Sequence, residues 1–368
     1  MNKIFHILAG KANPNTMNGV NKVVDALANE QVKMNFNVTV VGIANNTEKR
    51  HQPIYNYKLF KKTGFFSYPK EALEYLLDNS DENSIFHFHS VFIPWFLPLI
   101  KALKKHGREH FFLTPHGQYV NAAMKASLKK RLFFSFFDKR ILREVEAVHI
   151  IGCCTENNHY INDNSKRVTV IPNGYYRTND YAYETNKSLV FGYIGRLEYK
   201  QKGLDNLLFA FSKYIKNGGH GSLWIAGKGP DEDFLKRIAQ KENIKDAVHF
   251  LGVVYDDEKW AFLKSCSALI TPSNWEGIPT GCLESASLGC PQLITEATNL
   301  GPYVRKYHSG LVISKSEVSS ITNLLADFEV IFGTEKYFEM RKNTKKMIDE
   351  ELNWSNITSR IVKELYGI

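Results

Sequence analysis

Two glutamates, Glu276 and Glu284, stand with seven residues between them in a segment rich in glycine and proline, residues 274–291. Pro279 suits the first position of a helix, where its missing N–H is not needed, and Gly289 is a natural helix end. Glu276 therefore precedes the predicted helix, and Glu284 lies one turn inside it. Carboxylates in these positions reach opposite ends of one ligand, which suits two sets of hydroxyls flanking a diphosphate rather than an acid/base pair.

The start of this predicted helix supplies an anion site between the two carboxylates. Its free N–H groups fall at about residues 278–282, and the helix dipole adds positive charge there. The alternative interpretation is a surface loop whose glutamates only cap and solvate an ordinary helix. The motifs elsewhere in the chain favour the ligand site.

Two basic residues that could bind a diphosphate follow an apolar run near the middle of the chain. The run over residues 189–194 ends in Gly195-Arg196, and the loop after it ends in Lys202-Gly203. The arginine guanidinium can donate two parallel hydrogen bonds and the lysine ammonium carries a compact charge, so the two would neutralise a departing diphosphate. Solvated surface charge is the alternative. Further on, residues 250–254 form another strand end, with Val254 last, which suits a nucleotide base.

The first half of the chain carries two weaker signals. A glycine, Gly19, stands at the start of an amphipathic helix after the loop of residues 10–18, where the backbone would come close to a phosphate. Histidines stand at the ends of two predicted strands, His89 and His116. A histidine at the carboxyl end of a strand is placed to touch a ligand, although single histidines often only satisfy local hydrogen bonds.

The elements that position these residues are short apolar runs alternating with helical patterns, which indicate repeated βα units and parallel sheets. The predicted strands are 4–8, 38–41, 85–89, 111–114, 147–151 and 168–171, then 189–194, 222–226, 248–250, 268–271 and 291–294. They predict an α/β protein of two Rossmann-like, doubly wound domains. The predicted boundaries are 1–174, 175–350 and a C-terminal helix, 351–368, that packs back toward the N-terminal domain.

The net charge of +9 comes from one region. Residues 1–174 hold 23 basic and 14 acidic residues, and residues 101–143 alone hold 11 and 2. Aromatic and basic residues alternate there at helical spacing, which suits an anionic membrane surface or an anionic acceptor, while a solvated helix is the alternative. The residues expected at this surface are Lys125, Lys129, Lys130, Arg131, Phe133 and Phe137. Nucleic acid is disfavoured because no binding motif accompanies the charge.

Several protein classes are excluded or disfavoured by pattern. No apolar run reaches transmembrane length and the N-terminus does not resemble a signal peptide, so we expect a cytoplasmic protein. Five cysteines without a C-x-x-C pair argue against a disulfide framework and a zinc site. No strand is followed by G-x-G-x-x-G, which disfavours a nicotinamide-dependent dehydrogenase.

Taken in order, the motifs resemble those of the retaining glycosyltransferases of family 4, which have the two-domain GT-B fold. The resemblance covers essentially the whole chain and is strongest over residues 189–295. The chain departs from the family at Asn18-Gly19, often Gly-Gly, and at Pro279, often glycine. The resemblance implies that Arg196 and Lys202 bind the donor diphosphate, Glu284 the ribose and Glu276 the transferred sugar, without a metal ion. The implied donor contacts are Gly19, Gly195, Arg196, Lys202, Val254, Glu276, Gly277, Ile278, Pro279, Thr280 and Glu284, and the implied catalytic set is His116, Arg196, Lys202 and Glu276.

The expected activity is transfer of a sugar with retention from a UDP-sugar, or a GDP-sugar, to a glycan. The acceptor is expected to be lipid-linked, in bacterial cell-surface polysaccharide or lipopolysaccharide biosynthesis, with the enzyme peripheral on the inner face of the plasma membrane. The alternative on the same fold is a nucleotide-sugar epimerase or a phosphorylase. A catalytically silent membrane-binding module would not require Arg196, Lys202, Glu276 and Glu284 together.

Overall fold

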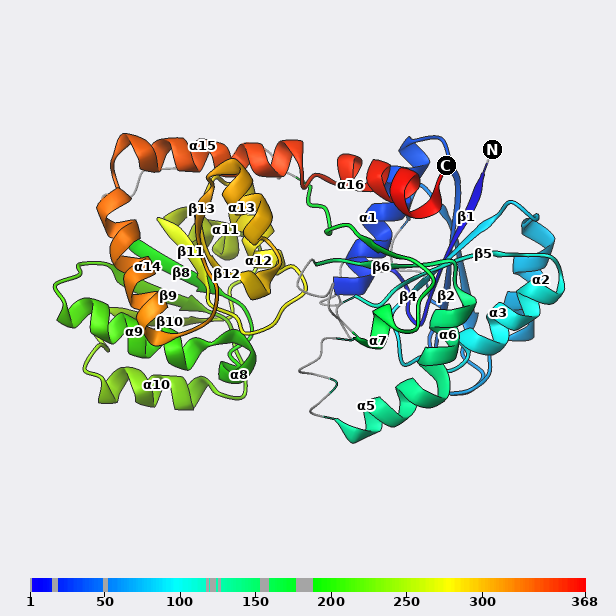
Figure 1. Ribbon diagram of the computed structural model, residues 1–368, viewed down its shortest axis with the longest axis horizontal. Coiled ribbons are helices and arrows are strands. Elements are labelled where there is room, and N and C mark those ends of the chain that lie inside the picture. Colours follow the sequence, from blue (N-terminus) through cyan, green and yellow to red (C-terminus); the bar gives the residue numbers. More distant parts are fainter. Residues whose placement is uncertain are drawn as a thin grey trace. The chain divides into compact units, whose positions relative to one another are not determined.

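The computed structural model describes residues 2–14, 19–48, 52–116, 119, 124, 127–152, 159–176 and 188–368. The chain divides into two compact units (Figure 1). One consists of Met1–Gly174 with Trp354–Ile368, and the other of Tyr175–Asn353. The second unit therefore extends three residues beyond position 350, and the C-terminal segment that joins the first unit begins at Trp354.

The described strands of the first unit form one parallel seven-stranded sheet in the order β3-β2-β1-β4-β5-β6-β7. The strands are β1 (Lys3–Leu8), β2 (Asn37–Ala44), β3 (Asn56–Lys61), β4 (Ile85–His89), β5 (His110–Thr114), β6 (Ala147–Ile150) and β7 (Val168–Val170). The helices are α1 (Gly19–Lys33), α2 (Lys70–Asn79), α3 (Phe96–Lys105), α5 (Leu128–Phe133), the π-helix η1 (Phe134–Asp138), α6 (Lys139–Glu144) and α7 (His159–Asn162). The C-terminal α16 (Trp354–Arg360) and the π-helix η4 (Ile361–Tyr366) complete the unit.

Alternation along β1 explains how this sheet is covered. Phe5 and Ile7 join the core under α2, α3 and α6, while Ile4 and Leu8 join the core under α1, α16 and η4. Successive side chains of a strand point to opposite faces, so a strand apolar at nearly every position is buried on both. In Figure 1, α16 lies beside α1 on one side of the sheet. The C-terminal segment is thus part of the first unit's core.

The second unit has a parallel sheet in the order β10-β9-β8-β11-β12-β13 among its described strands. The strands are β8 (Val190–Ile194), β9 (Ser222–Ala226), β10 (Val248–Gly252), β11 (Ala268–Thr271), β12 (Gln292–Thr295) and β13 (Gly310–Ile313). The helices are α8 (Tyr199–Lys202), α9 (Leu204–Lys216), α10 (Glu232–Lys241), α11 (Asp256–Ser265), α12 (Thr280–Ser287), the 3₁₀ helix η3 (Glu296–Thr298), α13 (Gly301–Tyr307), α14 (Val318–Ile331) and α15 (Glu335–Glu350).

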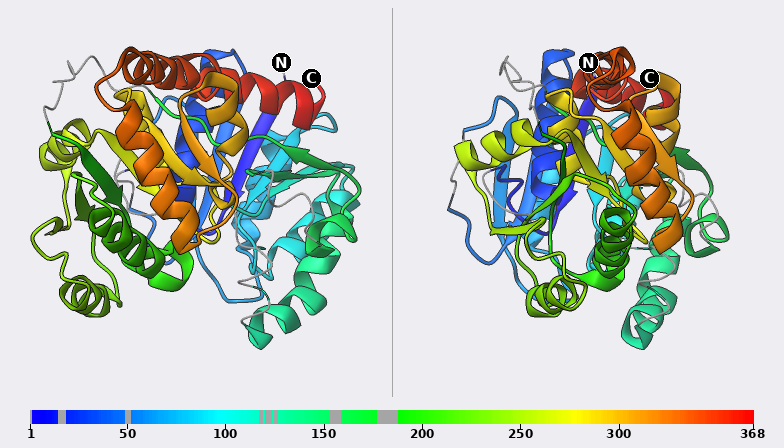
Figure 2. Two further views of the ribbon diagram at one scale, coloured as in Figure 1. Left: turned by 60° about the vertical axis from the view of Figure 1, so that its left-hand side comes forward. Right: turned by 90° about the vertical axis from the view of Figure 1, so that its left-hand side faces the viewer.

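Two cores sandwich this second sheet. Helices α9, α10 and α14 supply one face, and α11, α12 and α13 supply the other, with α9 and α14 side by side in Figure 2. Helix α15 contributes to both cores, through Tyr337 and Met340 to the first and through Met347 and Ile348 to the second. The expected α/β class with two doubly wound parallel sheets is confirmed. Two strands, β3 and β13, lie at sheet edges and were not predicted from the sequence.

Candidate functional site

The candidate site of the second unit lies where its sheet reverses its strand order. Chain connections run from β8 outward to β9 and β10 on one side, and the sheet continues through β11 and β12 on the other. Ligands of open α/β sheets bind at such a switch point, beyond the carboxyl ends of the strands. The segments that leave β8 and β11 there carry Arg196 and Glu276 respectively.

Lys202 and Glu276 form the central contact of this site. The ammonium of Lys202 is paired with Oε1 of Glu276, and the hydroxyl of Ser273 donates to the same oxygen at 3.0 Å. Only 16% of the Lys202 side chain and 9% of the Glu276 side chain are exposed. The structure therefore brings together the predicted diphosphate cation and the predicted sugar-binding carboxylate.

The backbone positions Lys202 through the turn that follows it. Lys202 is the last residue of α8, and Gly203 takes a left-handed φ of 64° between α8 and α9. A Cβ at Gly203 would lie 2.2 Å from the carbonyl oxygen of Pro272 and 2.3 Å from Oγ of Ser316. Only glycine fits this close approach between α8 and the segment after β11.

Four further hydrogen bonds tie the Glu276 loop in place. The N–H of Asn274 donates to the carbonyl of Gln201 at 2.8 Å, and its side-chain amide donates to the carbonyl of Lys200 at 2.9 Å. The amide of Asn299 donates to the carbonyls of Glu276 and Gly277, at 3.0 and 2.7 Å. Sequence reasoning missed Asn299; its signal would have been the turn between residues 298 and 301, where it adopts a left-handed φ of 62°.

Helix α12 begins one residue later than its sequence pattern predicts. Pro279 is the N-cap, with φ −65° and ψ 124°, and Thr280 is the first helical residue. The extended ψ places proline just outside the helix, although its φ suits the first turn equally well. Because the first N–H groups of a helix have no intrahelical acceptor, Thr280 and Gly281 present theirs at this end. The helix stops before Gly289, which has a φ of 80°.

Glu284 lies on α12 and is held by a lysine that sequence reasoning did not include. The ammonium of Lys259, on α11, lies 2.9 Å from Oε1 of Glu284. The Glu284 charge also raises the pKa of Tyr175, after the larger effect of burial. The two glutamates thus have separate lysine partners, Lys202 and Lys259.

The remaining predicted residues of this unit differ in their exposure. Arg196 is 67% exposed, with its guanidinium 3.6 Å from the carboxylate of Glu198, so it is available to an anion. The hydroxyl of Tyr193 donates to the Arg196 carbonyl at 3.0 Å and fixes the turn after Gly195. Val254 is partly buried two residues before α11. Ile278 is buried in the core under α12 and offers only backbone atoms.

In the first unit, His116 follows β5 with a left-handed φ of 52°. Its Nε2 lies 3.1 Å from Nδ1 of His89, the last residue of β4. Burial lowers the pKa of His116 to about 3, so the ring is neutral near pH 7. Gly19 is the exposed first residue of α1, and a Cβ there would meet no atom of the described residues within 4 Å. Gly117, Gln118 and Asn18 lie outside the described residues.

The basic aromatic segment forms α5, η1 and α6. Lys125 lies outside the described residues. Lys129 and Arg131 are exposed, but Phe133 and Phe137 are only partly exposed, with ring centroids 4.9 Å apart. The exposed side of this helical segment instead carries Leu128, Leu132 and Phe136, which are 63, 50 and 58% exposed. No helix among the described residues has the length and hydrophobicity needed to cross a membrane.

Two exposed phenylalanines that sequence reasoning missed extend this surface. Phe65 and Phe66, in the loop between β3 and α2, are 53 and 60% exposed. Their rings contact those of Phe133 and Phe137, with centroids 6.3 and 5.6 Å apart. The two consecutive phenylalanines in an otherwise mostly polar loop were the available signal. We call Phe65, Phe66, Leu128, Leu132, Phe133, Phe136 and Phe137 the aromatic patch.

Two family models match consecutive parts of the chain. Residues 17–176 match the model described as Glycosyltransferase Family 4, and residues 181–347 match the model described as Glycosyl transferases group 1. The chain is 28% identical over 174 residues to the glycosyltransferase MJ1607 of Methanocaldococcus jannaschii, covering 46% of this chain and 43% of that protein.

A second relative is an Escherichia coli enzyme, UDP-Gal:α-D-GlcNAc-diphosphoundecaprenol α-1,3-galactosyltransferase. Identity is 29% over 221 residues, covering 54% of each protein. The matched part of the chain thus spans about half the length of these curated relatives. Among solved structures, Anabaena HepE in complex with UDP and glucose superposes with a TM-score of 0.71 at 14% identity, over 100% of both chains. From its paired family models and its fold, the chain belongs to the group 1, family 4 glycosyltransferases of GT-B architecture.

Proposed function

We propose that this glycosyltransferase moves a sugar, with retention, from a UDP-sugar to a lipid-linked glycan of a bacterial cell-surface polysaccharide. The observation that carries the proposal is the Lys202–Glu276 pair at the switch point of the second sheet, beside the N-terminus of α12. The names of the E. coli relative, which uses UDP-Gal and a diphosphoundecaprenol acceptor, and of the HepE complex with UDP and glucose support the choice of uridine and of lipid.

The proposed chemistry needs no metal ion. Negative charge grows on the diphosphate oxygen as its bond to the sugar carbon breaks, and preorganised positive groups stabilise that charge. Lys202, Arg196 and the free N–H groups at Thr280 and Gly281 supply it. Glu276 binds hydroxyls of the transferred sugar and Glu284 binds the ribose. Attack on the face that the diphosphate leaves then retains the anomeric configuration.

A ligand screen tests the proposed donor. A UDP-sugar present at about 100 times its dissociation constant should stabilise the folded protein by about 2.7 kcal/mol and raise its melting temperature. The screen includes GDP-sugars and is run with EDTA, because no metal is proposed. A shift with GDP-sugars alone would contradict the choice of uridine. Incubation with the donor alone separates transfer from epimerisation, because an epimerase converts the donor without any acceptor.

We further propose that the aromatic patch docks on the anionic inner surface of the membrane. Cations lie beside its five exposed apolar side chains. Lys62 Nζ is 5.8 Å from the Phe65 ring centre, and Lys130 Nζ is 5.8 Å from the ring centre of Phe92, which contacts Phe133 of the patch. Apolar side chains that insert below the headgroups, combined with basic residues at their level, are the combination that interfacial binding requires.

Vesicle flotation at low and high salt tests this docking. The protein should float with vesicles containing phosphatidylglycerol and remain unbound with phosphatidylcholine alone. The double variant Phe66→Ser/Phe136→Ser should bind at least about tenfold more weakly, because each phenylalanine contributes about 1.5–3 kcal/mol on full burial. Val330→Ser, which removes a 79% exposed apolar side chain of α14, is the control. Equal flotation of both variants would contradict the proposal that the aromatic patch docks on the membrane.

A further inference from the structure

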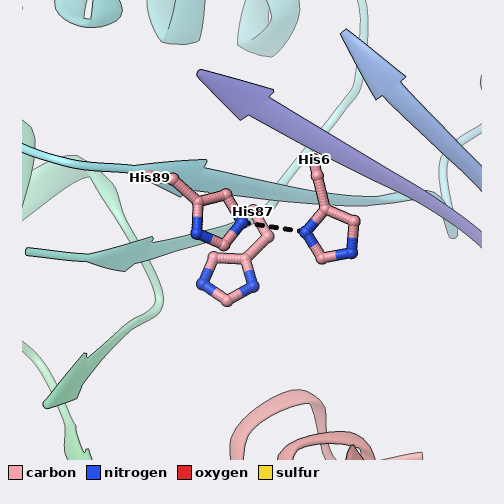
Figure 3. A group of neighbouring side chains, drawn as sticks. All are labelled: His6, His87 and His89. Carbon is pink, nitrogen blue, oxygen red and sulfur yellow. Dashed lines mark hydrogen bonds between the residues drawn. The ribbon is translucent and has the colours of Figure 1, made fainter. Parts of the chain in front are cut away.

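Five buried or partly buried histidines of the first unit belong to one chain of hydrogen bonds. His6, His87 and His89 lie on β1 and β4, and His149 lies on β6. Register places them on one sheet face, because His6 pairs with His87 and His89 pairs with Thr114. In Figure 3, His6, His87 and His89 project from neighbouring strands with their rings close together. Burying so many polar rings is costly unless each nitrogen has a partner.

The distances connect these rings into an unbranched path. The first half of the path joins His116 Nε2 to His89 Nδ1 at 3.1 Å, His89 Nε2 to His6 Nδ1 at 2.9 Å, His6 Nε2 to Gln31 Oε1 at 2.6 Å, and Gln31 Nε2 to Tyr366 Oη at 3.4 Å. The second half joins Tyr366 Oη to His87 Nδ1 at 2.7 Å, His87 Nε2 to Thr114 Oγ1 at 2.6 Å, Thr114 Oγ1 to His149 Nδ1 at 2.9 Å, and His149 Nε2 to the Ile171 carbonyl oxygen at 2.7 Å. Its middle residue, Tyr366, lies on η4 of the C-terminal segment.

The last atom of the path, the carbonyl oxygen of Ile171, determines which group donates and which accepts in every hydrogen bond along it. The carbonyl oxygen of Ile171 only accepts, so His149 donates from Nε2 and its Nδ1 accepts from Thr114. Thr114 then accepts from His87 Nε2, and His87 Nδ1 accepts from Tyr366. In the same way, Tyr366 accepts from Gln31 Nε2, Gln31 Oε1 accepts from His6 Nε2, and His6 Nδ1 accepts from His89 Nε2. His116 must carry its proton on Nε2, leaving Nδ1 as an acceptor.

The reverse order fails at the Ile171 carbonyl. It would place the lone pair of His149 Nε2 against that oxygen at 2.7 Å. Neutral rings are required throughout, since a ring with one acceptor nitrogen carries a single proton. Desolvation by burial keeps these rings neutral. It lowers the pKa of His6 and His149 to about 4 and the pKa values of His87 and His89 well below 6.5.

We propose that this hydrogen-bond chain holds His116 in its Nε2–H tautomer, and that Tyr366 is the positioning residue that transmits the order to it. Within the proposed function, on which this inference rests, Nδ1 of His116 then accepts a hydrogen bond from the substrate. Nδ1 has no hydrogen-bond partner among the residues that the structure describes. A tautomer exchange would turn this acceptor into a donor.

A metal ion is the competing use of the same atoms. One ligand nitrogen from each of His6, His87 and His89 lies within 4.8 Å of the others. All six ring nitrogens of these residues nevertheless have hydrogen-bond partners in the path above. A metal would have to displace protons that already join two protein groups. The geometry points to a proton chain.

Histidine NMR of the full-length protein, labelled with ¹⁵N and free of substrate, tests the inference. In the wild type, His6, His87, His89, His116 and His149 should all give the spectrum of neutral Nε2–H rings. Tyr366→Phe removes only the hydroxyl that joins Gln31 to His87, so the amide of Gln31 is free to flip. His116, His89 and His6 should then become tautomer mixtures, while His149 stays ordered.

Tyr55→Phe is the matched control, because it removes a buried phenol hydroxyl bonded to Asp25 in the same unit, outside the chain. It should leave all five spectra unchanged. An Nδ1–H or doubly protonated His116 in the wild type, no change in Tyr366→Phe, or one bound equivalent of zinc by elemental analysis would each overturn the inference.

Turnover gives an independent readout. Tyr366→Phe should lower kcat by about 2- to 10-fold, the value of one hydrogen bond, with a nearly unchanged donor KM. His116→Asn, which keeps an acceptor near Nδ1 and tolerates a positive φ, should retain more activity than His116→Gln; the opposite order would count against the inference. The spectra do not depend on catalysis, so absence of transfer with every donor would refute the proposed function alone.

Discussion

Lys202→Met is expected to lower kcat for sugar transfer by about 10²- to 10³-fold, the effect of removing one preorganised group that stabilises a developing oxyanion. The ammonium of Lys202 is paired with Glu276 and is 16% exposed, so its charge acts where water screens it weakly. The loss should fall mainly on kcat, because charge develops on the diphosphate only in the transition state.

Among the described residues, the same substitution leaves the Glu276 carboxylate with the Ser273 hydroxyl as its side-chain hydrogen-bond donor. Breaking a buried ion pair costs about 3–5 kcal/mol, so urea unfolding must accompany the kinetics. Lys200→Met is the matched control, since Lys200 lies on the same short helix with an exposed side chain. If Lys202→Met is folded and kcat stays within about threefold of the wild type, the leaving-group role is wrong.

Glu284→Gln is expected to raise the donor KM by about 10- to 100-fold, because hydrogen bonds to a charged group contribute about 1.5–3 kcal/mol. Glu284 is 17% exposed and held by Lys259 at 2.9 Å, so its carboxylate is already oriented before any ligand arrives. In the proposed role, Glu284 binds the ribose equally in the ground state and the transition state, so kcat should change little.

Steady-state kinetics with the preferred UDP-sugar measures the effect of Glu284→Gln. Glu232→Gln serves as the control, because Glu232 pairs with Lys236 on the exposed side of α10. A variant with unchanged KM and reduced kcat would instead make Glu284 part of the chemical step. Comparing the two glutamates in this way distinguishes their proposed roles, sugar for Glu276 and ribose for Glu284.

Local patterns were sufficient for most of the fold. The predicted strands 85–89, 222–226 and 268–271 coincide with β4, β9 and β11, because buried parallel strands are continuous apolar runs between turns. The two missed strands are edge strands. β3 carries polar residues at three of its six positions, Asn56–Lys61, so it lacks the apolar run of a central strand. The short apolar run of β13, Gly310–Ile313, was missed although it is as long as that of β11.

The site residues were recognisable by type, but their partners were not. The Lys202–Glu276 contact joins positions 74 residues apart, and the Lys259–Glu284 contact joins two helices whose packing no local pattern reports. The histidines illustrate the same limit. Alternation already places His87 and His89 on one face of a strand. Their connection to His6, His149 and Tyr366 depends on strand order and on the C-terminal segment, which are properties of the tertiary structure.

The central claim is that the chain transfers a sugar from a UDP-sugar to a lipid-linked acceptor with retention. NMR of the product formed from an α-linked UDP-sugar and a polyprenyl-diphosphate-linked sugar tests it most directly. The account predicts a new glycosidic bond on the acceptor with the α configuration of the donor, and no reaction of the donor in the absence of acceptor. A β-linked product would contradict retention, and conversion of the donor without transfer would contradict the transferase assignment.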